Sequence, residues 1–387
     1  MSDVALQKGK AFFTLVGKPR ITDLTFKIDE VSASGYTYSR FNLGVETAPG
    51  NIVYGDCMGG YNPTSGTVIY VCAKDDFKDK FEIDWDDRFN EKILANVNDF
   101  KFVKVGLETY DDNGTSKTLY KRFLSWYDAI PYIKEHLSPD SVVVVNGNLK
   151  YSIYNDKLQI KKDISSIYLS NKTELKDMKA TFVQSILIDK QSLYKDKENN
   201  EYLLTGRVID YLKKLGSKEI KKNVPYVMNY IIEGADTEKT SKMLSKFFKV
   251  KKGITEIAVE GNIIEGTNVK EVTEDDISDE MKELIEIGLY DKDEIIGKLA
   301  VRGERISKLI ITRPYILKTI KDDGSANIQV FITPEKYIHE DLDFDFEDTE
   351  AEDETESTED KTETTETNTE AKTEEKKAND DSWLNDL

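Results

Sequence analysis

The sequence predicts a mainly β protein: two tandem five-stranded barrels with helical insertions, followed by a disordered acidic C-terminal tail. Three observations support this prediction. Short stretches rich in Val, Ile, Tyr, Phe and Thr alternate with Gly, Asn, Asp and Lys turns, which is typical of strands. A strand pattern, V-[N/E]-G-N-[L/I], occurs twice, around Gly147 and around Gly261. Acidic residues are concentrated at the C-terminal end of the chain.

Each copy of the repeated strand follows a candidate helix. Ser125 can cap a helix over 126–137, and Thr237 can cap one over 238–250. A helix followed by a strand that a glycine allows to coil is what a small closed barrel needs between its third and fourth strands. We therefore expect a first barrel over 8–172 with an insertion at about 77–124. We expect a second barrel over 178–338 with a helical insertion at about 274–294.

The formal charge of −19 is located almost entirely in the tail. Residues 340–387 hold 21 Asp+Glu and 4 Lys, which leaves 52 acidic and 50 basic side chains in residues 1–339. The tail is also of low complexity, so it cannot bury enough apolar surface to offset the loss of chain entropy. We expect a nearly neutral folded body with a disordered polyanion attached to it.

In the first barrel, period-2 patterns separate an apolar face from an aromatic and basic one. Along 35–46, Phe41, Leu43 and Val45 share one face of the strand. The hairpin over 142–163 likewise directs Val143, Val145, Leu149, Leu158 and Ile160 inward. The predicted outward residues are Tyr36, Tyr38, Arg40, Lys150, Tyr154, Lys157 and Lys161.

In the second barrel, a basic loop leads directly into aromatic residues. The predicted loop spans 213–222 and joins a strand over 201–212 to one over 223–234. Tyrosines on an open sheet can stack unpaired bases while lysines contact the phosphates. The residues predicted to do this here are Lys213, Lys214, Lys218, Lys221, Lys222, Tyr226 and Tyr230. The alternative is that the tyrosines belong to the core and the lysines to a solvated turn.

Several of these segments together resemble the bacterial and phage single-stranded-DNA-binding protein family. Residues 12–20 resemble its first strand, 38–47 its second, and 141–169 its fourth and fifth strands. The resemblance implies OB-type barrels, and it implies that Tyr154 stacks a base. It also suggests that Tyr70, within 67–74, occupies a similar position on the third strand.

The tail carries the other part of this resemblance. Members of the family end in an acidic tail whose apolar tip recruits replication and repair proteins. This chain ends in a comparable tip without the usual Pro-Phe, and exposed apolar groups on an anionic tether suit a grooved, basic partner. The partner-binding residues predicted here are Asp380, Asp381, Trp383, Leu384 and Leu387.

No pattern in the chain indicates catalysis. His136 and His339 are isolated, and no phosphate-binding or dinucleotide motif is present. An acidic turn at Asp84, Asp86 and Asp87 is better explained as a solvated surface turn than as a metal site. We therefore expect a non-enzymatic protein that needs no cofactor or metal. The absence of an apolar span, a signal peptide and a disulfide framework favours the cytoplasm.

The function predicted is binding of single-stranded DNA with little sequence specificity, during replication, recombination or repair. A second copy of the chain is a further candidate partner. Two alternatives stay open: a protein-interaction scaffold of phage replication or assembly, and a single-stranded RNA-binding or annealing protein, because OB-type barrels accept either nucleic acid.

Deletion of the acidic tail is expected to tighten binding to a single strand. A tethered polyanion competes with the ligand for a cationic groove, and salt screens both interactions. Titration of full-length and tail-deleted protein with poly(dT) at several salt concentrations measures the effect. An unchanged affinity would contradict competition by the tail.

Overall fold

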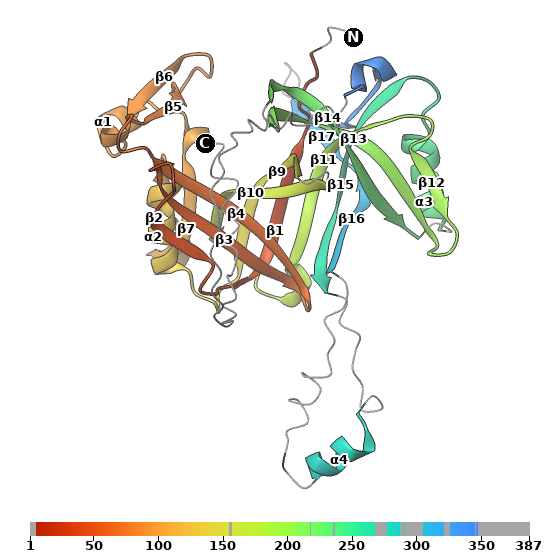
Figure 1. Cartoon of the computed structure of the whole chain (residues 1–387), viewed down its shortest axis with the longest axis horizontal. Helices are drawn as coiled ribbons and strands as arrows, with labels where there is room; N and C mark the ends of the chain where they lie inside the picture. Colours follow the sequence, from red (N-terminus) through yellow and green to blue (C-terminus); the bar gives the residue numbers. More distant parts are fainter. Residues whose placement is uncertain are drawn as a thin grey trace, which may run out of the picture.

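The computed structural model describes residues 5–154, 157–216, 218–234, 237–267, 277–286, 289, 305–320, 326–344 and 346. Within these residues the chain is mainly β, with few helices, as the sequence predicted. Figure 1 shows two barrels side by side, the first in red to yellow and the second in green to blue.

Five strands close the first barrel. Antiparallel pairs join β1 to β3, β3 to β4, β10 to β9 and β9 to β1, while β4 and β10 pair in parallel. This connectivity, with a helix between the third and fourth strands, is that of an OB-type barrel. The strands are β1 (Ala11–Arg20), β3 (Thr37–Ala48), β4 (Asn51–Tyr61), β9 (Val143–Tyr154) and β10 (Lys157–Leu169).

The second barrel repeats this connectivity strand for strand. β11 pairs with β13 and β15, β13 with β14, β15 with β16, and β14 runs parallel to β16. The strands are β11 (Lys179–Ile188), β13 (Glu201–Leu215), β14 (Lys218–Glu233), β15 (Ile254–Thr267) and β16 (Arg305–Pro314).

Both predicted helix starts are confirmed. Ser125 accepts a hydrogen bond from the backbone N–H of Tyr127 at the start of α2 (Trp126–His136), which buries Ile130 and Ile133 under the first barrel. Thr237 accepts one from the N–H of Thr240 at the start of α3 (Glu238–Met243). A π-helical turn, Leu244–Phe248, extends α3 and buries Phe248 in the second barrel.

The first insertion lies between β4 and α2. Its N-terminal part is a two-stranded sheet that projects from the barrel and has its own small core around Val71 and Ile83 (Figure 1). Its C-terminal part is a hairpin that extends the barrel sheet, because its first strand pairs in parallel with β10. The elements are β5 (Val68–Cys72), β6 (Lys80–Asp84), η1 (Trp85–Asp87), α1 (Glu91–Leu94), η2 (Asp99–Lys101), β7 (Val103–Asp112) and β8 (Thr115–Phe123).

The remaining elements are additional to the ten barrel strands. The helical insertion predicted around 274–294 contains α4 (Asp279–Glu286), and its other residues lie mostly outside the described ones. The others are β2 (Phe26–Val31), η3 (Leu175–Asp177), β12 (Leu193–Asp196), β17 (Ile316–Ile320), β18 (Ala326–Val330), β19 (Ile332–Tyr337) and η6 (His339–Leu342).

The first strands of the two barrels pair with each other. β1 and β11 are antiparallel, and Phe13 lies opposite Phe182 at the centre of the pairing. Gly147 pairs with Phe13, and Gly261 pairs with Phe182. A Cβ on either glycine would lie 2.5 Å from the neighbouring phenylalanine ring, so the repeated glycine makes room for that ring in each barrel.

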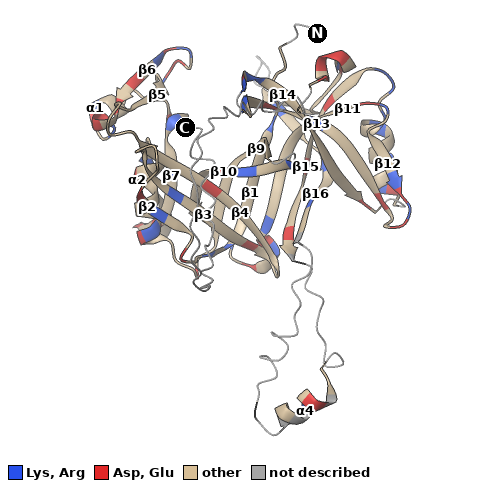
Figure 2. Ribbon diagram, in the orientation of Figure 1, with Lys and Arg blue, Asp and Glu red and all other residues tan. Residues whose placement is uncertain are grey.

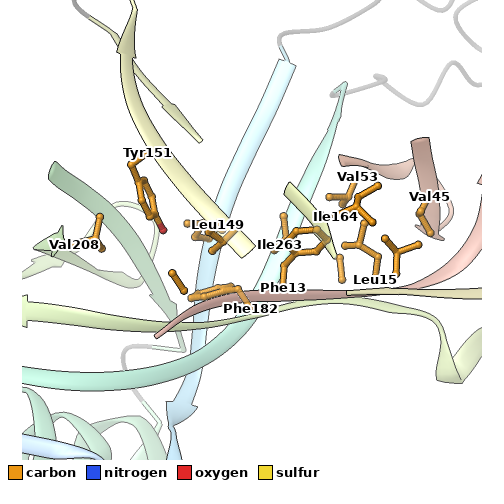
Figure 3. Close-up of a cluster of buried hydrophobic side chains, with 14 of the residues drawn as sticks. Phe13, Leu15, Val45, Val53, Leu149, Tyr151, Ile164, Phe182, Val208 and Ile263 are labelled. Atoms are coloured by element: carbon orange, nitrogen blue, oxygen red, sulfur yellow. The ribbon is translucent and has the colours of Figure 1, made fainter. Parts of the chain in front are cut away.

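The barrels therefore share one hydrophobic core (Figure 3). Tyr151 of β9 extends into the second barrel, where its hydroxyl donates to the side-chain oxygen of Gln184 at 2.6 Å. Its backbone N–H donates to the carboxylate of Asp210 at 3.0 Å. In the other direction, the N–H of Glu265 donates to the side chain of Asn51 at 2.7 Å. Each barrel thus supplies a hydrogen-bond partner to a polar group of the other.

Two sequence-based boundaries change. The basic segment over 213–222 is not a loop, because β13 continues to Leu215 and β14 begins at Lys218, which makes a long hairpin. The tail does not begin at Glu340. Residues His339–Leu342 form η6, and Phe346 packs on Tyr226 with ring centroids 5.4 Å apart, since both rings bury apolar surface.

Replacement of Tyr151 with Phe should destabilise the whole chain. The substitution leaves the buried side-chain oxygen of Gln184 without this donor, at a cost of about 1–3 kcal/mol in the free energy of unfolding. Tyr154→Phe, three residues along the same strand and half exposed, is the matched control and should have little effect. Urea denaturation measures both, and an equal loss of stability in the two variants would contradict this account of the interface.

Candidate nucleic-acid interface

One face of the first barrel carries the outward side chains of β3, β4, β9 and β10. The pairing of β9 with β10 places Lys150 opposite Lys161 and Tyr154 opposite Lys157. The intervening residues alternate inward, and Val145 and Leu149 are buried in the core. The predicted outward face of this hairpin is therefore present. We call the set Arg40, Tyr54, Lys150, Tyr154, Lys157 and Lys161 the barrel-1 shelf.

Tyr54 is the residue of the shelf that sequence reasoning missed. It pairs with Gly44 across β3 and β4, and its ring lies where a Gly44 side chain would be: a Cβ there would be 2.9 Å from Cε1 of Tyr54. The ring thus lies across the backbone of the neighbouring strand while the side chain stays 47% exposed. A period-2 reading of 51–61 beside the glycine in β3 would have indicated this arrangement.

Carboxylates separate the cations of the shelf. Asp56 lies 3.1 Å from Lys161 and 3.9 Å from Arg40, and Asp163 lies 2.7 Å from Lys150. Figure 2 shows that Lys and Arg positions alternate with Asp and Glu positions over the strands of the first barrel. Because such pairs are partly exposed, each contributes little to stability, and a phosphate can replace the carboxylate at small cost. The shelf has more cations than carboxylates.

A hollow of about 570 Å³ lies along this face. It is lined by Arg40, Tyr54 and Lys161 of the first barrel and reaches Glu265 and Ser307 of the second. At its inner end the ammonium group of Lys162 pairs with the carboxylate of Glu265 at 2.5 Å, and both side chains are nearly buried. This ion pair joins the barrels beneath the shelf.

Three of the predicted stacking tyrosines are not available at the surface. Tyr38, Tyr226 and Tyr230 are 3%, 1% and 0% exposed. Tyr38 lies on an interior strand, between Glu30 of β2 and Gly60 of β4, and β2 was not foreseen from the sequence.

The two tyrosines of β14 share a face, as predicted, but it is the inward one. Tyr230 stacks on Phe182 at 6.0 Å and Tyr226 lies 6.1 Å from Tyr151, so both belong to the core between the barrels. Burial raises the pKa of Tyr230 far above its usual range, and that of Tyr226 as well. The core alternative was the correct one for this strand.

Tyr70 and Tyr36 lie away from the shelf. Tyr70 is exposed, but it belongs to β5 of the projecting sheet, so its alignment with a third barrel strand is wrong; that strand is β4. Tyr36 is half buried, and its ring lies over Gly60, where burial raises the pKa of the hydroxyl.

The lysines of the second barrel gather at the end of the β13–β14 hairpin, and none of them lines the hollow of the shelf. Lys221 pairs with Glu219 at 2.6 Å, and the ammonium of Lys222 lies 5.0 Å from the ring of Phe344. Both line a pocket with Glu340, Asp341 and Asp343, at the start of the acidic segment. The other three predicted here, Lys213, Lys214 and Lys218, lie on the same hairpin.

The outward face of the second barrel differs from the shelf. Thr205 and Asn229 hydrogen bond to each other at 2.8 Å, and Val227 is an exposed neighbour on β14. Tyr211 is its exposed tyrosine on β13. At the centre of this face, the Thr205–Asn229 and Arg207–Val227 pairs supply one cation and no aromatic ring.

Other predictions cannot be placed. Asp380, Asp381, Trp383, Leu384 and Leu387 lie outside the described residues. Among the residues that the structure describes, no group of three or more His, Cys, Asp or Glu could hold a metal ion. In the same part of the chain, no helix is long and apolar enough to cross a membrane.

Comparison with solved structures finds a crystal structure of a deletion mutant of the single-stranded DNA binding protein from Thermus aquaticus. The match covers 67% of this chain and 88% of that one, with 10% identity and a TM-score of 0.28. No curated protein matches the chain.

A family model described as YorF matches residues 77–298. The matched region begins in the first insertion, includes the shelf strands β9 and β10, and continues through β15 of the second barrel. Because the match spans more than half of the chain, this protein belongs to the YorF family.

Proposed function

We propose that this protein binds single-stranded DNA with little sequence selectivity, without catalysing a reaction, and that the barrel-1 shelf is its binding surface. The observation that supports the proposal most is the tyrosine pair on this shelf. Tyr54 and Tyr154 are each about half exposed and stand among Arg40, Lys150 and Lys161 on one outward face.

The chemistry of the shelf suits unpaired bases. A tyrosine ring that lies flat on a sheet offers its free face to a base of any sequence, and each stacked base contributes about 1–3 kcal/mol. Lysine and arginine side chains beside the rings contact phosphates. An intact duplex stacks its bases internally, so it cannot use both kinds of contact.

Replacement of Tyr54 with Ala should weaken binding to oligo(dT), because a stacking surface worth about 1–3 kcal/mol is removed, which corresponds to fivefold or more in Kd. Tyr154→Ala should act similarly. Tyr194→Ala is the matched control, since this tyrosine is 66% exposed on β12 of the other barrel. Fluorescence anisotropy of labelled oligo(dT) measures the affinities, and equal effects in all three variants would exclude the shelf.

Replacement of Lys157 with Ala should reduce the dependence of binding on salt. One lost phosphate contact lowers the slope of log K against log salt by about 0.7 for a single strand. Lys190→Ala, an exposed lysine between β11 and β12, is the control. If the slope is unchanged in the Lys157 variant, Lys157 does not contact a phosphate of the bound strand.

RNA is the alternative single-stranded ligand. The shelf would also accept RNA, because nothing in it requires or rejects a 2′-hydroxyl group. Competition between matched oligo(dT) and oligo(rU) separates the two, and stronger competition by RNA would reassign the ligand. We propose further that Trp383, Leu384 and Leu387 at the tail tip recruit replication or repair proteins, a part of the proposal supported by sequence alone.

A further inference from the structure

A second surface outside the two barrels repeats the geometry around Tyr54. It lies on the β7–β8 hairpin of the insertion, where the ring of Tyr120 occupies the space beside Gly106. A Cβ on Gly106 would lie 2.9 Å from Cε1 of Tyr120, the same separation as between Gly44 and Tyr54. Tyr120 is 52% exposed. Each of the two tyrosine rings therefore lies beside a glycine of the neighbouring strand, with about half of the side chain exposed to solvent.

The charges around the two tyrosines also correspond. Beside Tyr54, Asp56 lies between Arg40 and Lys161. Near Tyr120, Asp99 pairs with Lys104 and lies 3.4 Å from Arg122. Lys104 pairs with Arg122 across the hairpin, two residues before Gly106 and two after Tyr120. The hydrogen bond from Lys104 holds the pKa of Asp99 below its usual range, so this carboxylate is an anion held between two cations.

Strand β10 connects the two surfaces. Its edge pairs with β4 at Asp163 and with β7 from Ser166 to Tyr168. The ring of Tyr168 lies 5.9 Å from that of Tyr120, and the hydroxyl of Tyr168 accepts a hydrogen bond from Asn146, on the same outward face of β9 as Lys150. From Lys161 to Tyr168 the strand spans on the order of 20 Å. Outward polar residues thus continue from the shelf to the hairpin.

We infer that the β7–β8 hairpin is a second base-stacking site, formed by Tyr120 with Lys104 and Arg122, and that a single strand bound to the barrel-1 shelf continues onto it along β10. In this arrangement Asp99 occupies the position that a phosphate takes when DNA binds. Phe100, which follows Asp99, is 82% exposed and extends the apolar surface beyond the cations. The inference rests on the proposed function and adds the insertion to its binding surface.

Two substitutions in the full-length protein test this inference. Tyr120→Ala should weaken binding to long oligo(dT) by about fivefold or more, from the loss of one stacking surface. Asp99→Asn should tighten binding to the same oligonucleotide by about two- to fivefold, because the carboxylate that competes with phosphate loses its charge. If Asp99 only stabilises the hairpin, Asp99→Asn should weaken binding or leave the affinity unchanged, and either result would contradict the inference. Tyr110→Ala, on the same hairpin opposite Lys117, is the control for a loosened hairpin.

A series of oligo(dT) lengths from about 4 to about 30 nucleotides, a range that includes the site sizes of single OB-type barrels, separates this inference from the proposed function. The expected result is that Tyr120→Ala affects the long oligonucleotides and leaves the shortest unchanged, whereas Tyr54→Ala affects all lengths. If the wild-type protein binds and neither hairpin variant changes affinity at any length, the second site is wrong and the shelf stands. If the wild-type protein binds no length, both proposals fail.

Discussion

The pairing of β1 with β11 is the interaction on which the rest of the architecture depends. It places Phe13 opposite Phe182 and aligns two equivalent barrels around that contact. Because Gly147 and Gly261 each leave space for one of these rings, the repeated glycine found in the sequence has the same packing role in both barrels. Strands β9 and β15 then extend across the contact, and Tyr151 and Asn51 satisfy polar groups of the opposite barrel. The buried residues of the two barrels consequently form one continuous hydrophobic core.

This shared core also positions the candidate binding surface. Inward residues of β9 and β10 are fixed by packing against both barrels, so their outward neighbours Lys150, Tyr154 and Lys161 are held on a rigid sheet. Rigid placement matters for stacking, because less side-chain entropy is lost when a base binds. The carboxylates between the cations keep the surface only weakly positive in the absence of ligand.

Much of the fold followed from local patterns, whereas the site followed only in part. Alternation placed the inward face of β9 correctly because Val143, Val145 and Leu149 share one parity and all three are buried. The same reasoning failed on β14, where Tyr226, Met228 and Tyr230 share a parity that suits either a core or a stacking face. Only the packing against Tyr151 and Phe182 decides between them. Tyr54 was missed for another reason: alternation along 51–61 places it on the outward face, but its position over Gly44 becomes evident only once the pairing of β3 with β4 is known.

The covalent joining of the two barrels has an evolutionary consequence. In a symmetric homodimer every substitution appears in both subunits, so a change that suits a ligand face is imposed on its twin. Here each barrel is encoded separately, and the outward faces have been free to diverge: Tyr54 and its cations on one, Thr205, Val227 and Asn229 on the other. A substitution on the outward face of one barrel therefore leaves the outward face of the other unchanged.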